Sequence, residues 1–307
     1  MKKVLYLVLV IVFATLPTTG CGEDAGLPED EPAVFATPEP TPTPTPITTP
    51  TPTPEHKTIT IRGNEYCTSL TKLVLLHFSE HYGLNNEDMV QLQYMENLEL
   101  LVISALYVDD ITPLSGLTNL RRLDLNVHWT GNGINDLSPL AGLANLEELE
   151  FRGSRINDLS SLSGLVNLIR LDLSGPVSLI SDLSPLSGLT NLEWLNLAIN
   201  EISDITSLSN LYNLEVLYLG SNQIIDISPL SNLYNLEVLS LSSNQIVDIS
   251  PLSNLTNLVE LNLARNQISD ITPLSELKNL RHVSVENNFV TDWTPIYHVP
   301  YDLNFGP

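Results

Sequence analysis

The sequence has 307 residues, among them 13 Lys or Arg and 36 Asp or Glu, so its formal net charge is −23 at pH 7. This excess of acids disfavours nucleic acid and phosphate-rich membrane as partners and leaves cationic or neutral partners open. Removing residues 1–20 would remove two lysines and no acid, which makes the charge −25.

The first twenty residues predict a signal peptide, because Lys2 and Lys3 precede an apolar run over residues 4–16 that is too short for a comfortable membrane span. We therefore exclude residues 1–20 from the fold. The ending Thr19-Gly20-Cys21 resembles a bacterial lipobox, although Thr18 stands where that family prefers Leu. The resemblance implies a lipidated Cys21 on the extracellular face of a bacterial membrane. The alternative is an ordinary signal peptide and free secretion.

Residues 21–55 predict a disordered stalk, since Thr and Pro nearly alternate between residues 36 and 55. Proline fixes φ and removes hydrogen-bond donors, so this segment is expected to run as polyproline II at ~3.1 Å per residue. Its threonines are candidates for O-linked sugars, and a passive tail is the alternative. If Cys21 is acylated, Cys67 is a single thiol without an internal disulfide, and stability must come from the folded core.

Residues 56–97 predict an N-terminal cap. Residues 58–61 alternate as an edge strand would, and Leu70, Leu73 and Leu75 form a degenerate strand motif. Residues 86–95 then predict a short amphipathic helix with Asn85 or Asn86 as its N-cap.

From residue 98 to 296 the motif Leu-x-x-Leu-x-Leu-x-x-Asn recurs in nine units, mostly 22 residues apart, and is followed each time by a pattern close to Ile-x-Asp-Ile-x-Pro-Leu. The units begin at Leu98, Leu120, Leu146, Leu168, Leu192, Leu214, Leu236, Leu258 and Leu280. Such periodicity indicates a leucine-rich-repeat array. We expect an α/β repeat solenoid: a curved horseshoe with a parallel β-sheet on its concave face and short 3₁₀ or irregular segments on its convex face. Such solenoids rarely build catalytic pockets.

Positions within a unit are counted from its first leucine. Positions 1, 4, 6 and 11 are expected in the core, and the asparagine at position 9 is expected to bond buried backbone groups of its own and the adjacent coil. These asparagines are Asn200, Asn222, Asn244, Asn266 and Asn288.

The aspartate of position 13 is present in all nine units, from Asp110 to Asp292, and stands later by the length of the insertion in the two longer units, at Asp136 and Asp182. We predict that each caps the N-terminus of a short convex helix that tolerates Pro in its first turn. The alternative, a ladder of calcium ligands, is disfavoured because N-cap bonds already stabilise the ionised carboxylates.

The pattern Asn-x-Ile-x-Asp-Ile-Ser-Pro-Leu-Ser-x-Leu-x-Asn-Leu, at residues 222–236 and 244–258, closely resembles the internalin-type bacterial leucine-rich repeat. The resemblance implies convex 3₁₀ helices, an extracellular location and recognition of protein or glycan on the concave face. After the repeats, residues 297–307 predict a C-terminal cap or tail; Trp293, Pro295, Ile296, Tyr297 and Tyr301 are candidates for closing the last coil.

The concave face should present positions 3 and 5, with neighbouring coils ~4.8 Å apart. Asp124, Glu150 and Asp172 would repel one another there unless arginines interleave with them. Arg122, Arg152 and Arg170 are the arginines placed to do so. A salt-bridge lattice and a ligand site are the two interpretations.

Trp194 and Tyr218 indicate a binding patch, because large aromatic side chains on an exposed sheet anchor interfaces or stack on sugars. The predicted concave-face site consists of Trp194, Tyr218, Val216, Asn196, Arg170, Asp172, Arg152 and Glu150, with Val238 beside it.

Two units are longer than 22 residues, through insertions at residues 128–133 and 175–178 on the same rim of the array. Rim loops commonly extend a solenoid's binding face, so His128 and Trp129 are further candidates. Packing of Trp129 against its coil is the alternative.

Residues 77–81, His-Phe-Ser-Glu-His, spell the His-x-x-Glu-His pattern of some zinc peptidases. That chemistry needs one helix that presents both histidines and a third ligand downstream, and the sequence predicts neither. We expect no enzyme activity, metal or cofactor. The predicted function is a cell-surface module that binds a protein or glycan; the alternative is an envelope or cell-cell assembly protein that acts through self-association of its repeats.

Overall fold

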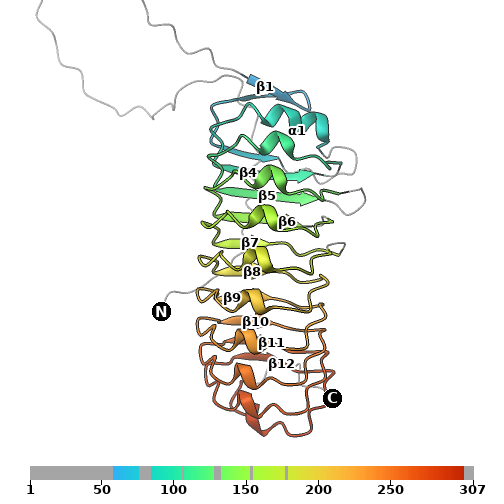
Figure 1. Ribbon diagram of the computed structural model, residues 1–307, viewed down its shortest axis with the longest axis vertical. Helices are drawn as coiled ribbons and strands as arrows, with labels where there is room; N and C mark the ends of the chain where they lie inside the picture. Colours follow the sequence, from blue (N-terminus) through green and yellow to red (C-terminus); the bar gives the residue numbers. More distant parts are fainter. Residues whose placement is uncertain are drawn as a thin grey trace, which may run out of the picture.

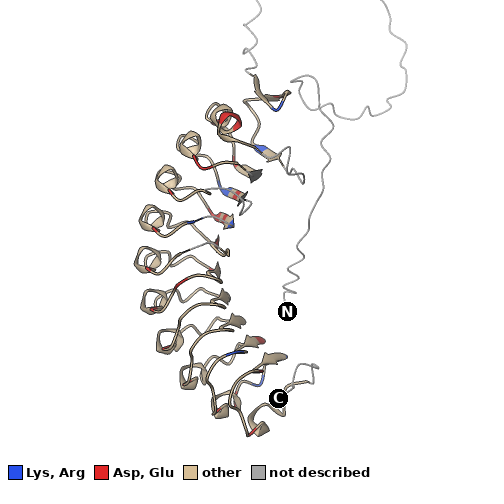
Figure 2. Ribbon diagram, turned by 90° about the vertical axis from the view of Figure 1, so that its right-hand side faces the viewer, with Lys and Arg blue, Asp and Glu red and all other residues tan. Residues whose placement is uncertain are grey.

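The computed structural model describes residues 58–75, 84–105, 107–127, 133–152, 155–176 and 179–300. They form a curved solenoid whose coils stack along one long axis (Figure 1). In side view, the strands line the concave face and the short helices line the convex face (Figure 2). The predicted leucine-rich-repeat horseshoe is confirmed. The predicted signal peptide, Cys21 and the stalk lie outside the described residues.

The concave face is a ten-stranded parallel sheet in which each strand pairs with the next in sequence order. Its strands are β3 (Lys72–Leu75), β4 (Leu100–Ala105), β5 (Arg122–Val127), β6 (Glu148–Arg152), β7 (Arg170–Asp172), β8 (Trp194–Asn196), β9 (Val216–Tyr218), β10 (Val238–Ser240), β11 (Glu260–Asn262) and β12 (His282–Ser284). The register aligns equivalent repeat positions, as in Leu195, Leu217 and Leu239. Positions 3 and 5 of neighbouring coils therefore stand side by side.

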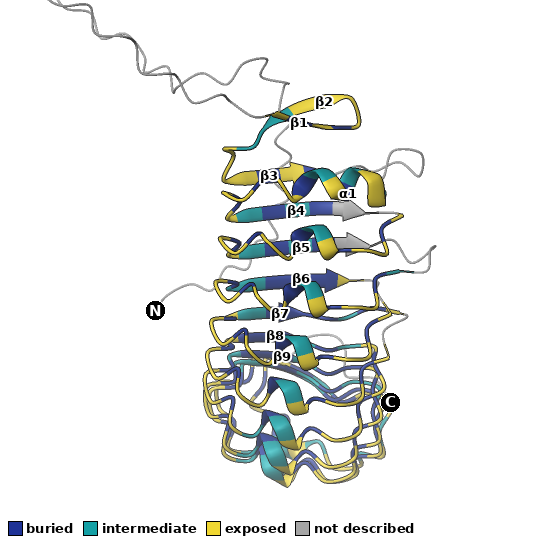
Figure 3. Ribbon diagram, turned by 45° about the horizontal axis from the view of Figure 1, so that its top comes forward, coloured by how far each residue is buried: buried dark blue, intermediate teal, exposed yellow. Residues whose placement is uncertain are grey.

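The convex face carries one 3₁₀ turn per coil. These turns are η1 (Thr112–Leu114), η2 (Ser138–Leu140), η3 (Ser160–Leu162), η4 (Ser184–Leu186), η5 (Thr206–Leu208), η6 (Ser228–Leu230), η7 (Ser250–Leu252), η8 (Thr272–Leu274) and η9 (Thr294–Ile296). Leucines and isoleucines of successive coils fill the space between these turns and the sheet, and Figure 3 shows buried residues along the strands. This continuous core is the main stabilising feature of the array, because each coil buries its apolar face only by stacking.

The asparagine ladder at position 9 is confirmed. In the coil of β9, the Nδ2 of Asn222 donates to the carbonyl oxygens of Leu197 and Leu219, each at 3.0 Å, and its Oδ1 accepts the N–H of Ile202 at 3.0 Å. One side chain thus satisfies backbone groups of two coils.

Sequence analysis assigned no role to the asparagine at position 22, which forms a second ladder on the opposite edge. The Nδ2 of Asn213 donates to the carbonyl oxygen of Thr190 in the preceding coil at 2.8 Å, and Asn235 does the same to Tyr212. Asparagine side chains thereby hydrogen-bond each coil to its neighbour on both sides of the core.

The aspartate column caps the convex turns, but not from the predicted position. The N-cap residue of η6 is Ile227, whose side chain makes no cap bond, and Asp226 lies one residue earlier. The Oδ1 of Asp226 accepts the N–H of Ser228 at 2.8 Å, and the same bond recurs in all nine units. The correction follows from the tightness of a 3₁₀ turn, whose first N–H is in reach of a carboxylate two residues before it. Hydrogen bonds to Thr206 lower the pKa of Asp204.

The predicted N-terminal cap contains β1 (Thr58–Ile61), β2 (Asn64–Cys67), β3 and α1 (Asn86–Leu92). β1 pairs antiparallel with β2 in a separate two-stranded sheet, while the degenerate motif forms β3. Asn85 is the N-cap of α1 and forms a reciprocal capping box with Asp88. Asp88 also pairs with Arg62 at 2.6 Å, which ties α1 to the β1–β2 hairpin.

At the C-terminal end, Ile296 is buried and Trp293 packs against the core, as predicted. Tyr297 does not close the last coil, because its side chain is 71% exposed. Tyr301 lies outside the described residues. Within the described ranges, no helix is long and apolar enough to cross a membrane.

Cys67, the last residue of β2, is disulfide-bonded and is not the single thiol expected from the sequence. The sequence holds one other cysteine, Cys21, which lies outside the described residues.

Candidate binding surface

The N-terminal half of the concave face carries the predicted lattice of acids and arginines, which we define as Arg122, Glu148, Glu150, Arg152, Arg170 and Asp172. Arg152 bridges Glu150 and Asp172, with nitrogen–oxygen distances of 2.9 Å to each. Arg170 reaches Glu150 at 3.0 Å, and Arg122 reaches Glu148 at 2.9 Å. In Figure 2, basic and acidic residues lie together on β5 and β6.

Two carboxylates of the lattice are more buried than the acids of an ordinary surface network of ion pairs. Asp172 is 1% exposed and Glu150 is 7% exposed, so their charges depend on the arginines that contact them. Removing one partner of a buried pair leaves a charge without compensation, which is strongly destabilising. The buried carboxylates of the lattice are therefore compensated by its own arginines.

Asp124 lies beside the lattice without joining it. Among the described residues, its carboxylate makes no hydrogen bond or ion pair, and the Nε of Arg122 is buried without a partner. Burial and, next, the charge of Glu150 raise the pKa of Asp124 to about 6, more than Arg122 and Arg152 lower it. The carboxyl group of Asp124 therefore binds its proton more tightly than an ordinary aspartate does.

Trp194 does not stand exposed on the sheet as the sequence analysis assumed. The Cζ of Arg170 lies 3.4 Å from the centroid of its ring, and the ring of Tyr218 meets it edge-on with centroids 5.7 Å apart. Trp194 is consequently 9% exposed, and Val216 in the next strand is 5% exposed. The reason is the parallel register, which brings position 3 of adjacent strands within reach of long side chains. Trp194 thus borders the lattice and contacts its Arg170 through a cation–π interaction.

The C-terminal half of the concave face is hollowed into a groove of about 260 Å³ over β9–β12. We define the concave groove by its lining side chains, which are Tyr218, Val238, Leu239, Ser240, Glu260, Leu261, Asn262, His282, Val283 and Ser284. Position 5 is Ser, Asn and Ser in three successive strands, and these short side chains leave the space that Tyr218 bounds on one side.

Several polar groups of the concave groove have no partner within the described part of the chain. The hydroxyls of Ser240 and Ser284, the Nδ2 of Asn262 and the carboxylate of Glu260 form no hydrogen bond or ion pair there; Asn262 uses only its Oδ1, toward the N–H of Ala264. Such groups can donate to and accept from a ligand without breaking an internal bond. The two halves of the concave face therefore differ in character.

Comparison with known proteins agrees with this architecture. The family of "Leucine Rich repeats (2 copies)" matches residues 190–232, 234–276 and 256–298. An internalin (InlF) from Listeria monocytogenes is 33% identical over 76% of this chain and 67% of its own, with a TM-score of 0.68. Internalin C2 from the same organism is 36% identical over 61% of this chain and 79% of its own, with a TM-score of 0.55. The chain belongs to the internalin-like leucine-rich-repeat proteins.

A further solved structure, a leucine-rich-repeat protein of Leptospira interrogans, is 26% identical to the internalin-like chain, with a TM-score of 0.59. The match covers 72% of this chain and 54% of the Leptospira protein. No curated protein matches the sequence significantly.

The structure separates the residues predicted for the internalin-like binding site. Arg152, Glu150, Arg170 and Asp172 are joined to one another in the lattice, and Trp194 and Val216 are covered. The half-buried Asn196 binds Ser174 and the N–H of Ala198. Tyr218 and Val238 line the groove. His128 and Trp129 lie outside the described residues.

Sequence reasoning did not single out Ser240, Glu260, Asn262, His282 and Ser284. The available signal was a run of small polar residues at position 5, which becomes a hollow only when three coils stack.

The described residues contain no group of three or more His, Cys, Asp or Glu that could hold a metal ion. The aspartate column is held by backbone N–H groups instead. The His-x-x-Glu-His sequence lies outside the described residues.

Proposed function

We propose that this internalin-like protein is a non-catalytic binding module that holds a protein partner in the concave groove over β9–β12. The observation that carries the proposal is the set of polar groups around one hollow that have no partner within the described residues: the hydroxyls of Ser240 and Ser284, the carboxylate of Glu260 and the Nδ2 of Asn262. The neighbouring lattice supports the same assignment, because its carboxylates are already paired with arginines and offer a partner little that is not already used.

The proposal includes a location at the outer surface of a bacterial cell. The signal peptide and the Thr/Pro-rich stalk support it, since a signal peptide directs export and a stalk that follows a lipid anchor would lift the repeats clear of the membrane. The intact mass of the mature chain tests the anchor: a diacylglyceryl mass on Cys21 supports it, whereas a Cys21–Cys67 disulfide in a chain without lipid contradicts it.

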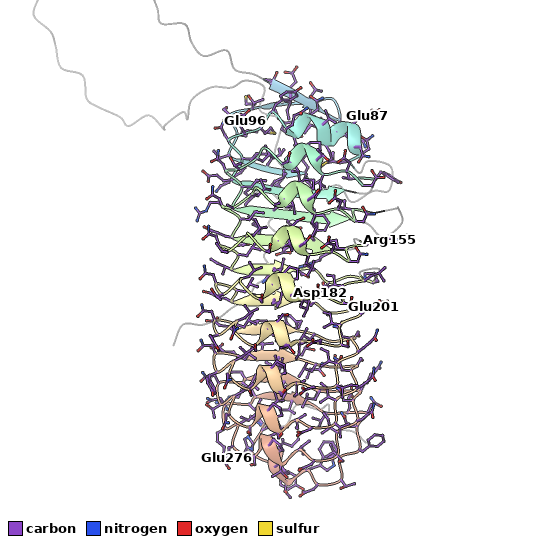
Figure 4. All side chains as sticks on the ribbon, viewed as in Figure 1. Glu87, Glu96, Arg155, Asp182, Glu201 and Glu276 are labelled. Atoms are coloured by element: carbon purple, nitrogen blue, oxygen red, sulfur yellow. The ribbon has the colours of Figure 1, made fainter. Side chains whose placement is uncertain are left out.

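Site-specific photocrosslinking tests the binding function. A benzoylphenylalanine placed at Ser240 lies in the concave groove. The same residue at Gln245 lies at the exposed position 10 of the same coil, which is the position that Arg155 and Glu201 occupy at the long edge in Figure 4. Both variants are incubated with envelope fractions and secreted proteins and then irradiated, after circular dichroism has shown matched folding.

We expect one discrete protein adduct at Ser240 and none at Gln245. Equal adducts at both positions, or none at either, contradict a groove-specific function. An adduct between two copies of the chain at Ser240 would instead identify self-association, the assembly alternative.

A further inference from the structure

The carboxylates of the lattice are paired with arginines, whereas the carboxylate of the concave groove is not. In the lattice, Glu148, Glu150 and Asp172 each contact an arginine. In the concave groove, Glu260 is the only carboxylate among the lining residues, and within the described ranges no cation lies within 4 Å of it. Neither Arg265 nor Arg281, the two arginines nearest in sequence, forms an ion pair with it.

The surroundings of Glu260 suit a long cationic side chain. Its strand register places Val238 on one side and His282 on the other, both at position 3 and each ~4.8 Å away. Lys and Arg lay their aliphatic stems along apolar surface while the charged head meets an acid. Val238 offers that apolar surface, and it is half-buried.

A partner that covers the concave groove removes water from Glu260. Burying a carboxylate without a counter-charge is strongly unfavourable, and a neutral ligand such as an uncharged sugar supplies no counter-charge. The acidic chain, with its net charge of −23, also attracts cations over distance.

We infer that the concave groove recognises a partner segment that carries a Lys or Arg side chain, with its cation on Glu260 and its stem across Val238. Ser240, Asn262 and Ser284 then supply hydrogen bonds to the polar groups of that segment. This inference rests on the proposed function and adds the chemistry of the partner.

The test is a selection of random nine-residue peptides, displayed on phage, against the full chain. Four proteins are compared: the parent, Glu260→Gln, Glu260→Lys and Glu276→Gln. Glu276 follows η8 on the outer long edge of the array, away from the sheet (Figure 4), and its side chain is 77% exposed. Its substitution removes the same charge from the chain and so controls for non-specific attraction of cationic peptides.

We expect the parent and Glu276→Gln to enrich peptides with a Lys or Arg at a fixed place. A selected peptide should bind Glu260→Gln about tenfold more weakly, as expected for loss of a close interfacial charge pair. Glu260→Lys should enrich Asp or Glu at that place, because the introduced charge repels the original ligand.

Two outcomes overturn the inference while leaving the proposed function intact: enriched peptides without a basic residue, or a basic preference that Glu260→Gln and Glu276→Gln reduce equally. Failure of the parent to enrich any peptide, together with no adduct at Ser240, would instead overturn the proposed function.

Discussion

At the scale of single residues, position 8 of the later coils holds left-handed backbone just after each strand. Its φ is +57° at Ser221, +55° at Ser243, +58° at Arg265 and +56° at Asn287, and +61° at Ile199. A β-branched side chain at positive φ clashes with its own backbone, whereas Asn tolerates this region. Ile199 is 48% exposed, so its burial offsets little of this strain.

We therefore predict that Ile199→Asn raises the free energy of unfolding by about 1 kcal/mol and that the reciprocal Ser243→Ile lowers it by a similar amount. Urea unfolding followed by circular dichroism measures both. A loss of stability in Ile199→Asn would show that packing of the isoleucine outweighs its backbone strain.

Asp124 gives a prediction about pH. Its folded-state pKa of about 6 lies above the ordinary 3.8, so the folded protein binds this proton more tightly than the unfolded chain. The ionised carboxylate therefore destabilises the fold above about pH 6, and this cost disappears as pH falls toward 3.8.

Asp124→Asn should accordingly raise the free energy of unfolding at pH 7.5 by on the order of 1 kcal/mol, a figure reduced for the partial exposure of the group. The difference from the parent should vanish at pH 4. Urea unfolding at both pH values measures it, and an equal difference at the two values would rule out the ionisation as its cause.

At the scale of elements, the asparagine ladders hold adjacent coils together. Asn222→Ala leaves the carbonyls of Leu197 and Leu219 and the N–H of Ile202 without their bonds to this side chain inside the core. Because buried polar groups without partners are costly, we predict a loss of about 2–4 kcal/mol. Asn288 makes the same bonds in the last coil but is half-buried, so water can replace them.

Asn288→Ala should therefore cost about 1 kcal/mol, and thermal unfolding of the two variants side by side measures the difference. Equal losses would mean that the ladder acts through its geometry rather than through burial of the backbone groups.

At the scale of the whole molecule, the fold could be predicted because one repeated pattern fixes both the strand register and the core. Leu214, Leu217 and Leu219 could be assigned inward from spacing alone, and they are fully buried. Trp194 could not be placed this way, because its exposure depends on Arg170 in the neighbouring strand and not on its own repeat position. The concave groove could not be predicted from spacing either, since it arises from short side chains in three stacked coils.

The repeated architecture also predicts which deletions the fold tolerates. Within the described ten-stranded sheet, each strand contacts only the strands next to it, and the units that begin at Leu214 and Leu236 have nearly the same sequence. Deleting residues 214–235 joins Asn213 to Leu236 and preserves the register, so Leu239 would pair with Leu195 as Leu217 does. We predict a folded, shorter solenoid of slightly lower stability, because a repeat array is approximately a sum of its units and interfaces.

The deletion also replaces Tyr218 by Asn196 beside Ser240, which removes the aromatic wall of the concave groove. A variant that lacks residues 214–224, half a unit, provides the contrast, because it shifts the leucines out of the core and should unfold. Circular dichroism and cooperative thermal unfolding distinguish the two deletions. If the 22-residue deletion unfolds like the 11-residue one, the stability of the array does not reside in nearest-neighbour contacts. If it folds but loses the adduct at Ser240, then partner binding depends on the wall that Tyr218 provides.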